Sequence, residues 1–345
     1  GVPNNGDISV AINRTTGDVY GYNAVGNPYP SPISIASFLS DNSGVIGSTL
    51  WFWRKTNGVS GSAYITYSAG TYSSGSQSVY NIQPGQGFFV RATSSGSLQF
   101  KNSQRVGTNG SFFRNNSQTT ATGEGRLWLN LKSNAIVVGN LALGYKEGAT
   151  NDLDLVYDGE YLNDSSLALT SSLPGKELSV QHRAAPFVDT DVVPLSFKTD
   201  VSGTYSIDFN GTDGVLDTQD IYLEDLLLGQ SVDIKTTPYT FASAAGTFSD
   251  RFRIVYINNA LGTDVPVFNA NQVVIYKNEI NDFVINSGNV IMSNIKVYDV
   301  RGRLLQEYKN VNDSQTTINV GLVNQVLLVQ ITSEDGVMVT KKVIR

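Results

Sequence analysis

The chain has 345 residues, enough for two or three domains, of which 40% are hydrophobic and only 16% are charged. Its formal net charge is −6 and it has no local cluster of Lys or Arg, so the basic footprint of a nucleic-acid-binding protein is absent. It contains no cysteine, which excludes disulfides, thiolate metal sites and a cysteine nucleophile.

The first residues, GVPNNGDISV, include no initiator Met and no export signal, so we expect Gly1 to lie inside a longer or processed polypeptide. One short helix is predicted in PISIASFLSDNSG, where Ser34 is placed to cap it and Gly44 to end it. Most other segments alternate with period two between Gly, Asn, Asp and Ser clusters, which is typical of strands. Examples in this part are AYITYSAG, GFFVRAT and SLQFK.

Two aromatic segments, LWFWRK and YITYSAGTY, stand out in the first part. Trp51 and Trp53 fall on one face of a predicted strand, and Tyr64 begins the next one. If these rings are exposed, they form a platform on which sugar rings can stack. If they are buried, they belong to the core of a β-sandwich, which is where such residues are found more often. Both interpretations stay open at the level of the sequence.

In the middle of the chain, GTYSIDF and FRIVYI read as strands, whereas DTQDIYLEDLLLG (Asp217 to Gly229) is a second candidate helix. Arg251, in the triplet Asp250–Arg251–Phe252, is expected to pair with a carboxylate at the protein surface, where such a pair contributes little. His182 is the single histidine, and no nucleophile-elbow motif accompanies it, so we interpret it as a structural residue.

Aspartates cluster in NDLDLVYDGE, at positions Asp152, Asp154 and Asp158. Oxygen-rich loops of this kind bind calcium, although Val156 occupies the position of a middle ligand. Aspartates also cap turns without any metal. Calcium is therefore a weak candidate cofactor, and the sequence predicts no other cofactor and no catalytic residues.

The turn spacing of about 8–12 residues predicts an all-β protein built of consecutive antiparallel β-sandwich domains. We divide the chain into a module over residues 1–124, a second module over 125–262 and a C-terminal domain over 267–345. In the last of these, IKVYDVRGRLLQEYKNV predicts a hairpin in which Asp299 to Arg303 form the turn and Gly302 adopts a positive φ.

The C-terminal domain resembles the type A sorting domain of proteins exported by the type IX secretion system. The family's hairpin is matched at Ile295, Val297, Tyr298, Asp299, Gly302, Leu304 and Leu305. A turn glycine, Gly336, and a basic end follow, with Lys341, Lys342, Val343, Ile344 and Arg345. Two positions depart from the pattern, since Leu327 or Leu328 stands where Tyr is common and Arg345 replaces the usual Lys. The segments GNPYPSPISIASFL and IQPGQGFFVRA resemble modules that precede such domains in large surface proteins.

The resemblance implies a small seven-stranded Ig-like sandwich that acts as a sorting signal. Its partners would be the type IX translocon and an outer-membrane β-barrel shuttle. A sortase-like protease that joins the cargo to lipopolysaccharide is a further possible partner. The whole protein would be a non-enzymatic cell-surface protein such as an adhesin of gliding bacteria. A carbohydrate-binding module and the non-catalytic tail of a secreted hydrolase are the alternatives. The three basic residues near the end either dock on acidic groups of a partner or are merely solvated.

Overall fold

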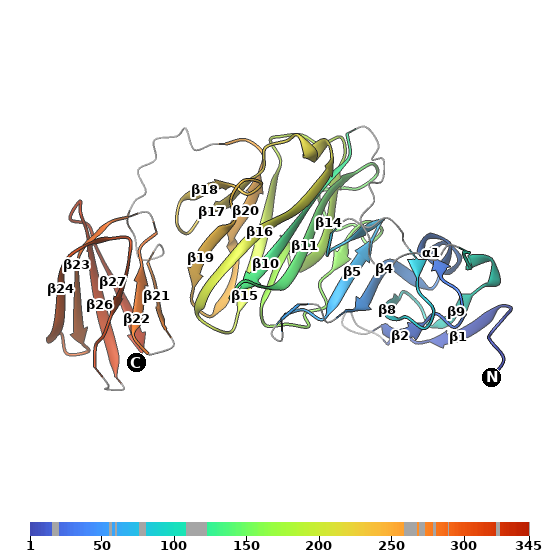
Figure 1. Cartoon of the computed structure of the whole chain (residues 1–345), viewed down its shortest axis with the longest axis horizontal. Helices are drawn as coiled ribbons and strands as arrows, with labels where there is room; N and C mark the ends of the chain where they lie inside the picture. The colour runs from blue at the N-terminus through green and yellow to red at the C-terminus, as the bar shows by residue number, and fades with distance from the viewer. Residues whose placement is uncertain are drawn as a thin grey trace. The chain divides into compact units, whose positions relative to one another are not determined.

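A computed structural model describes residues 1–15, 21–54, 57–58, 61–75, 81–107, 123–258, 268, 273–278, 281–288, 290–321 and 325–344. The protein is all-β, as the sequence predicts, with strands arranged in several sheets (Figure 1). Residues 1–131, 136–188 and 209–219 form one compact unit, and residues 132–135, 189–208 and 220–345 form another. The predicted boundaries at 262 and 267 lie outside the described residues. No helix in the described part of the chain has the length and apolar character needed to cross a membrane.

Within the first hundred residues, the described segments fold into three small sheets around one helix. The sheets are β1–β9, β3–β7 and the five-stranded β2-β8-β4-β5-β6. The strands are β1 (Ile8–Ile12), β2 (Tyr22–Gly26), β3 (Ile33–Ser34), β4 (Ile46–Trp53), β5 (Tyr64–Ser68), β6 (Thr71–Tyr72), β7 (Asn81–Ile82), β8 (Gly87–Ala92) and β9 (Gly96–Phe100). A 3-10 turn, η1 (Asn102–Gln104), follows them.

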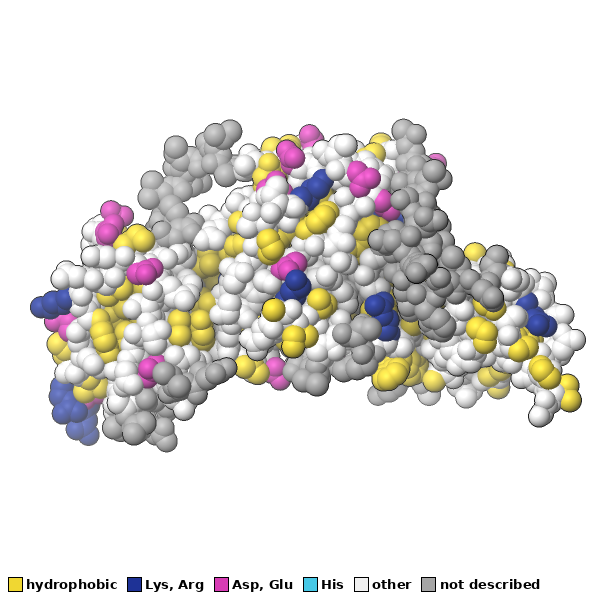
Figure 2. Space-filling model, in the orientation of Figure 1, with side chains coloured by type: hydrophobic (Ala, Val, Ile, Leu, Met, Phe, Trp, Pro, Cys, Tyr) yellow, Lys and Arg dark blue, Asp and Glu magenta, His cyan; other side chains and the backbone are white. Residues whose placement is uncertain are grey.

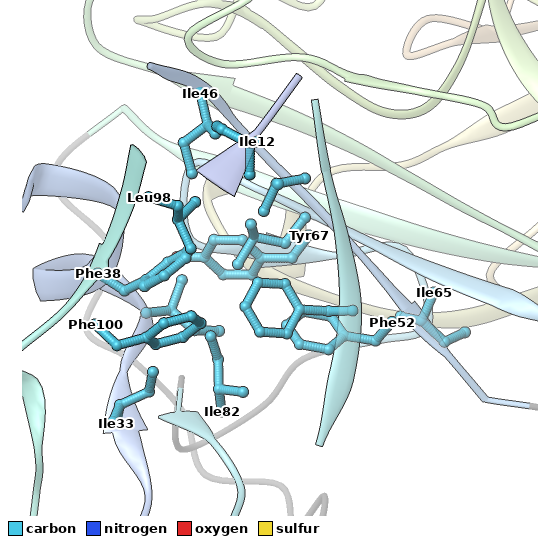
Figure 3. Packing of buried hydrophobic residues seen from close by; sticks show 14 of the residues in the cluster. Ile12, Ile33, Phe38, Ile46, Phe52, Ile65, Tyr67, Ile82, Leu98 and Phe100 are labelled. Carbon is cyan, nitrogen blue, oxygen red and sulfur yellow. The ribbon is translucent and has the colours of Figure 1, made fainter. Parts of the chain in front are cut away.

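The helix α1 (Ile35–Asn42) begins where the sequence predicts, because the Ser34 Oγ accepts a hydrogen bond from the Ser37 N–H at 3.3 Å. It ends at Asn42, two residues before Gly44. Its buried face packs on the core of this region, where the Phe38 ring lies 5.4 Å from Phe88 and 5.3 Å from Phe100 (Figure 3). This core fixes the inner face of the five-stranded sheet and leaves the other face for different contacts.

Longer strands follow in residues 123–188, in the order β13-β14-β11-β10. They are β10 (Gly125–Ser133), β11 (Ile136–Lys146), β13 (Ala168–Leu173) and β14 (Lys176–Ala184), and the short β12 (Gly159–Glu160) also pairs with β14. Asn134 and Ala135 adopt positive φ angles of 49° and 63° and make the tight turn between β10 and β11. β11 and β14 run parallel, a departure from the antiparallel pairing that the sequence predicts.

The second unit contains the run β18-β17-β20-β15, and also β19, which pairs with the first residues of β16, from Gly203 to Ile207. These strands are β15 (Val192–Thr199), β16 (Gly203–Gly214), β17 (Tyr222–Asp225), β18 (Gln230–Asp233), β19 (Tyr239–Ser243) and β20 (Gly246–Val255). The helix predicted from Asp217 to Gly229 is wrong. The 3-10 turn η2 (Val215–Asp217) precedes a strand that pairs with β18 on one side and β20 on the other. Pairing on both sides satisfies the backbone N–H and C=O groups of β17, and this outweighs the local preference of the segment for a helix.

Residues from 268 onward fold around their own core of aliphatic and aromatic side chains, which includes Phe283, Ile295, Val297, Val329 and Ile331. Their strands form one three-stranded sheet, β21-β22-β25, and one four-stranded sheet, β24-β23-β26-β27 (Figure 1). The bounds are β21 (Val274–Lys277), β22 (Phe283–Asn286), β23 (Met292–Asp299), β24 (Leu304–Asp313), β25 (Gln315–Ile318), β26 (Val326–Ser333) and β27 (Met338–Ile344). The strands described here thus number seven, which matches the strand count that the resemblance implies.

Candidate functional site

The turn of the C-terminal hairpin is built around Asp299, at the end of β23. Its Oδ1 accepts the N–H groups of Arg301 and Arg303, each at 3.0 Å, and its Oδ2 accepts the Arg303 Nε–H at 3.1 Å. These bonds, led by the one from the Arg303 backbone, lower the pKa of the Asp299 carboxyl. Gly302 has a φ of 79°, so the prediction of a positive φ there is confirmed. Asp299 and Gly302 therefore shape the turn.

The hairpin residues divide between two faces of the sheet. Val297 points into the core and is fully buried, whereas Tyr298 is half-buried on the outer face and Leu304 is exposed. Register pairing aligns one residue from each strand on that outer face, in the order Leu304, Tyr298, Leu328 and Lys342. We call these four residues the hairpin row. An apolar patch with a cation at one end is suited to recognising a protein surface that carries an acidic group.

The last strand, β27, is an edge of its sheet among the described strands. Gly336, with a φ of 80°, lies in the turn that leads into it. Val343 packs against the core, while Ile344 is 68% exposed. Lys341 is half-buried, and this burial lowers the pKa of its ammonium group. Arg345 lies outside the described residues.

The two predicted platform tryptophans differ in their surroundings. Trp51 is only 2% exposed, and its Nε1–H donates to the Glu160 carbonyl oxygen at 2.9 Å. Trp53, two residues further on the same face of β4, is 66% exposed. Tyr64 pairs directly with Trp53 across β4 and β5 and is half-buried. The structure therefore removes Trp51 from any exposed platform and leaves Trp53 and Tyr64 on an open face.

The aspartate loop is held together by hydrogen bonds of its own. The Asp158 Oδ2 accepts the Asp154 N–H at 2.8 Å, and its Oδ1 accepts the His182 N–H at 2.9 Å. The Asp154 Oδ1 in turn accepts the Val156 N–H. Asp152 is exposed. No group of three or more metal-ligating side chains is found within the described ranges, and the hypothesis that calcium binds here stays a prediction.

His182 is buried on β14, in keeping with the structural role predicted for it. Its Nδ1–H donates to the Tyr157 carbonyl oxygen at 2.8 Å, so the Nε2 atom is free to accept from the Thr71 hydroxyl at 2.9 Å. Burial lowers the pKa of the imidazole to about 4, and burial raises the pKa of the neighbouring Asp158 carboxyl to about 6. The histidine is therefore neutral and structural at pH 7.

One buried ion pair was not foreseen from the sequence. Arg251 and Asp225 are 2% and 0% exposed at their side chains, so the expected surface pair is wrong. The guanidinium also lies 4.7 Å from the centroids of both Phe241 and Phe252, and it donates to the Ala242 carbonyl oxygen. The Asp–Arg–Phe sequence gave no signal for this burial, because the carboxylate comes from a strand 26 positions earlier.

The protein therefore belongs to the all-β class. Its two most distinctive described surfaces are the hairpin row and the open face around Trp53. Charged side chains are sparse on the face that Figure 2 shows.

Residues 1–256 match a family described as "Domain of unknown function (DUF8693)", and residues 261–345 match one described as "Domain of unknown function (DUF8694)". Since the first match spans more than half of the chain, the chain belongs to the DUF8693 family. A search of the curated proteins found no match.

Proposed function

We propose that the chain is the C-terminal region of a cell-surface protein exported by the type IX secretion system, with residues 267–345 as the sorting signal. The motif of the hairpin and the basic end supports this proposal. One observation carries it furthest. The matched residues gather in one small β-fold with its own core, where some of them stabilise the fold and others remain on its outer face.

In this proposal the two groups of residues have different tasks. Val297, Asp299, Gly302, Gly336 and Val343 fold the signal, because they fill the core or shape turns. The hairpin row together with Ile344 is what a partner contacts. The partners are the translocon and the outer-membrane β-barrel shuttle. An exposed edge strand such as β27 offers unpaired backbone groups to a β-rich partner. Lys342 adds attraction to acidic groups.

The same proposal places the mature protein at the cell surface of a Gram-negative bacterium. A sortase-like protease would remove the signal and attach the remaining protein to lipopolysaccharide. The upstream modules then carry whatever the protein binds, and no catalytic step is assigned to the chain.

The test is an export assay in a bacterium that has the type IX system, with the chain placed behind an N-terminal export signal. The intact chain is expected at the surface, detected by antibody binding to whole cells. A variant lacking residues 267–345 is expected to accumulate in the periplasm, as is the intact chain in a strain without the translocon. Surface display of the shortened variant at the level of the intact chain would refute the proposal.

A further inference from the structure

The outer face of the five-stranded sheet is a mixed surface of aromatic rings and bare backbone. Its inner face carries Leu50, Phe52, Phe88 and Val90 into the core. Because side chains alternate along a strand, Trp51, Trp53 and Phe89 point the other way. Phe89 pairs with Trp51 across β8 and β4, and its ring lies 5.6 Å from that of Tyr64 in an edge-to-face arrangement.

One end of this face is closed and the other is open. At the closed end, β12 covers Trp51, and Glu160 binds Arg91 at 2.6 Å and Lys176 at 2.8 Å. At the open end Trp53 is 66% exposed, while Tyr64 and Phe89 are half-buried. An indole exposed to this extent forgoes much of the free energy that burial of its apolar surface would contribute. The core below the sheet does not include Trp53.

Bare backbone lies directly beside the exposed indole. The register that pairs Phe52 with Phe88 brings Gly87 next to Trp53, and Gly26 on β2 pairs with Gly87 in turn. Among the described residues, a Cβ added at Gly87 would meet only the Val25 carbonyl oxygen, at 3.7 Å, so no described side chain fills this space. We call this surface the Trp53 shelf: Trp53, Tyr64 and Phe89 rise beside Gly87 and Gly26.

We infer that the Trp53 shelf binds neutral oligosaccharides, with a pyranose ring stacked on the Trp53 indole. The C–H groups on one face of a pyranose carry slight positive charge and suit the negative face of an aromatic ring. Bare backbone at Gly87 and Gly26 lets the next sugar approach closely. Across two strand spacings the shelf measures about 10 Å, the length of a disaccharide.

Other occupants fit the shelf less well. A stable protein interface buries about 800 Å² on each partner, far more than one indole flanked by glycines offers. A single-stranded nucleic acid needs a positively charged groove beside the stacking ring. Here Arg91 and Lys176 are both held by Glu160 at the closed end, which neutralises one of their two charges and leaves no row of cations along the described part of the shelf. An uncharged ligand with many hydroxyl groups matches what remains.

The chain supplies its own reporter for the test. It has three tryptophans, and Trp51 and Trp128 are 2% and 1% exposed. A sugar that stacks on the shelf therefore changes the fluorescence of Trp53 selectively. The full 345-residue chain is titrated with cellohexaose, chitohexaose, mannohexaose and, as an anionic probe, heparin. Affinities are then measured by calorimetry.

At least one of the neutral hexasaccharides is expected to bind with a Kd of about 1 mM or tighter and to shift the Trp53 emission. Trp53→Ala is expected to weaken that binding at least about tenfold. Gly87→Val keeps the indole but fills the shelf, and it is expected to weaken binding similarly. Ile136→Ala, which changes an exposed aliphatic residue on β11, is the matched control and is expected to leave affinity unchanged.

The inference is overturned if no neutral hexasaccharide binds at about 1 mM, or if heparin alone binds. It is also overturned if Trp53→Ala and Gly87→Val, with unchanged melting temperatures, bind as tightly as the unmodified chain. Self-association that depends on Trp53, seen by sedimentation, would assign the shelf to a second copy instead. None of these outcomes depends on whether residues 267–345 direct export.

Discussion

Asp225 and Arg251 form an ion pair in the interior of the second unit, with the Nη2 atom 2.7 Å from Oδ2 and the Nε atom 3.1 Å from the same oxygen. Tyr239 donates its hydroxyl hydrogen to that oxygen, and the Leu227 and Leu228 N–H groups bind Oδ1. Burial and the Asp225 charge both raise the pKa of the Tyr239 phenol. Every oxygen of the buried carboxylate is thus compensated, which is the condition for tolerating a charge away from water.

Replacing Arg251 with Leu is expected to destabilise the β17–β20 region by about 3–5 kcal/mol, because an uncompensated carboxylate stays buried. Hydrogen exchange of the amides in these two strands measures the loss. The neighbouring pair on the same strands, Arg253 and Glu224, is the control, since Arg253 is 37% exposed. Arg253→Leu is expected to cost less, about 1–3 kcal/mol, because the Arg253 side chain is partly exposed, although the Glu224 side chain that it leaves is only 10% exposed. Equal losses in both variants would contradict the assigned role of the buried pair.

Gly302→Ala is expected to destabilise the C-terminal domain by about 1–2 kcal/mol, because an alanine at a φ of 79° brings its Cβ close to the following carbonyl. Urea unfolding followed by near-UV circular dichroism of the domain's tyrosines checks this value. Val300, in the same turn, is 66% exposed, and Val300→Ala should change stability by no more than about 0.5 kcal/mol. A harmless Gly302→Ala would show that the turn relaxes to another conformation.

Residues of the hairpin row are expected to affect export without affecting folding. Lys342→Glu reverses the charge of an exposed residue on the outer face, so the proposed docking is expected to weaken and surface display to fall severalfold. The matched control is Lys309→Glu, which makes the same charge change on β24 at a side chain that is 70% exposed. Both variants should melt at the temperature of the unmodified chain. Equal display of the two variants would exclude Lys342 from recognition.

The Asp158–His182 pair predicts a pH dependence that mutation uncovers. The pKa of Asp158 rises from 3.8 to about 6 on folding, so its stabilising contribution is present below pH 3.8 and is lost as pH rises through 6. The pKa of His182 falls from 6.5 to about 4, so its contribution is present above pH 6.5 and is lost as pH falls through 4. Between these limits the two contributions oppose each other.

Asp158→Asn removes one of the two contributions, so the free energy of unfolding should rise more steeply with pH from 4 to 6 than in the unmodified chain. His182→Gln should do the opposite. Each difference in slope is bounded at about 1.4 kcal/mol per pH unit. Denaturant unfolding is followed by the fluorescence of the buried Trp51 and Trp128, which both lie in the first unit and therefore report its free energy of unfolding. Parallel slopes in all three proteins would rule out the shifted pKa values.

Local patterns were sufficient for much of the fold. Alternation along the strands predicts the all-β class, Ser34 predicts the start of the helix, and the Asp299–Gly302 spacing predicts the turn of the hairpin. Each of these features depends on contacts between residues a few positions apart, such as a capping hydroxyl or a glycine with positive φ. Such contacts depend on particular residue types at short, fixed spacings, so they can be predicted from the sequence.

Only the tertiary structure decided what covers each face. Trp51 and Trp53 share one face of β4, yet their exposures are 2% and 66%, because Glu160 comes from 109 positions away to cover one of them. Contacts with distant strands also bury Arg251 against Asp225. Pairing with β20 likewise makes the segment at Tyr222 a strand, although its local pattern predicts a helix. Alternation determines which way a side chain points, but burial depends on which distant strand packs above it, and no local pattern encodes that choice.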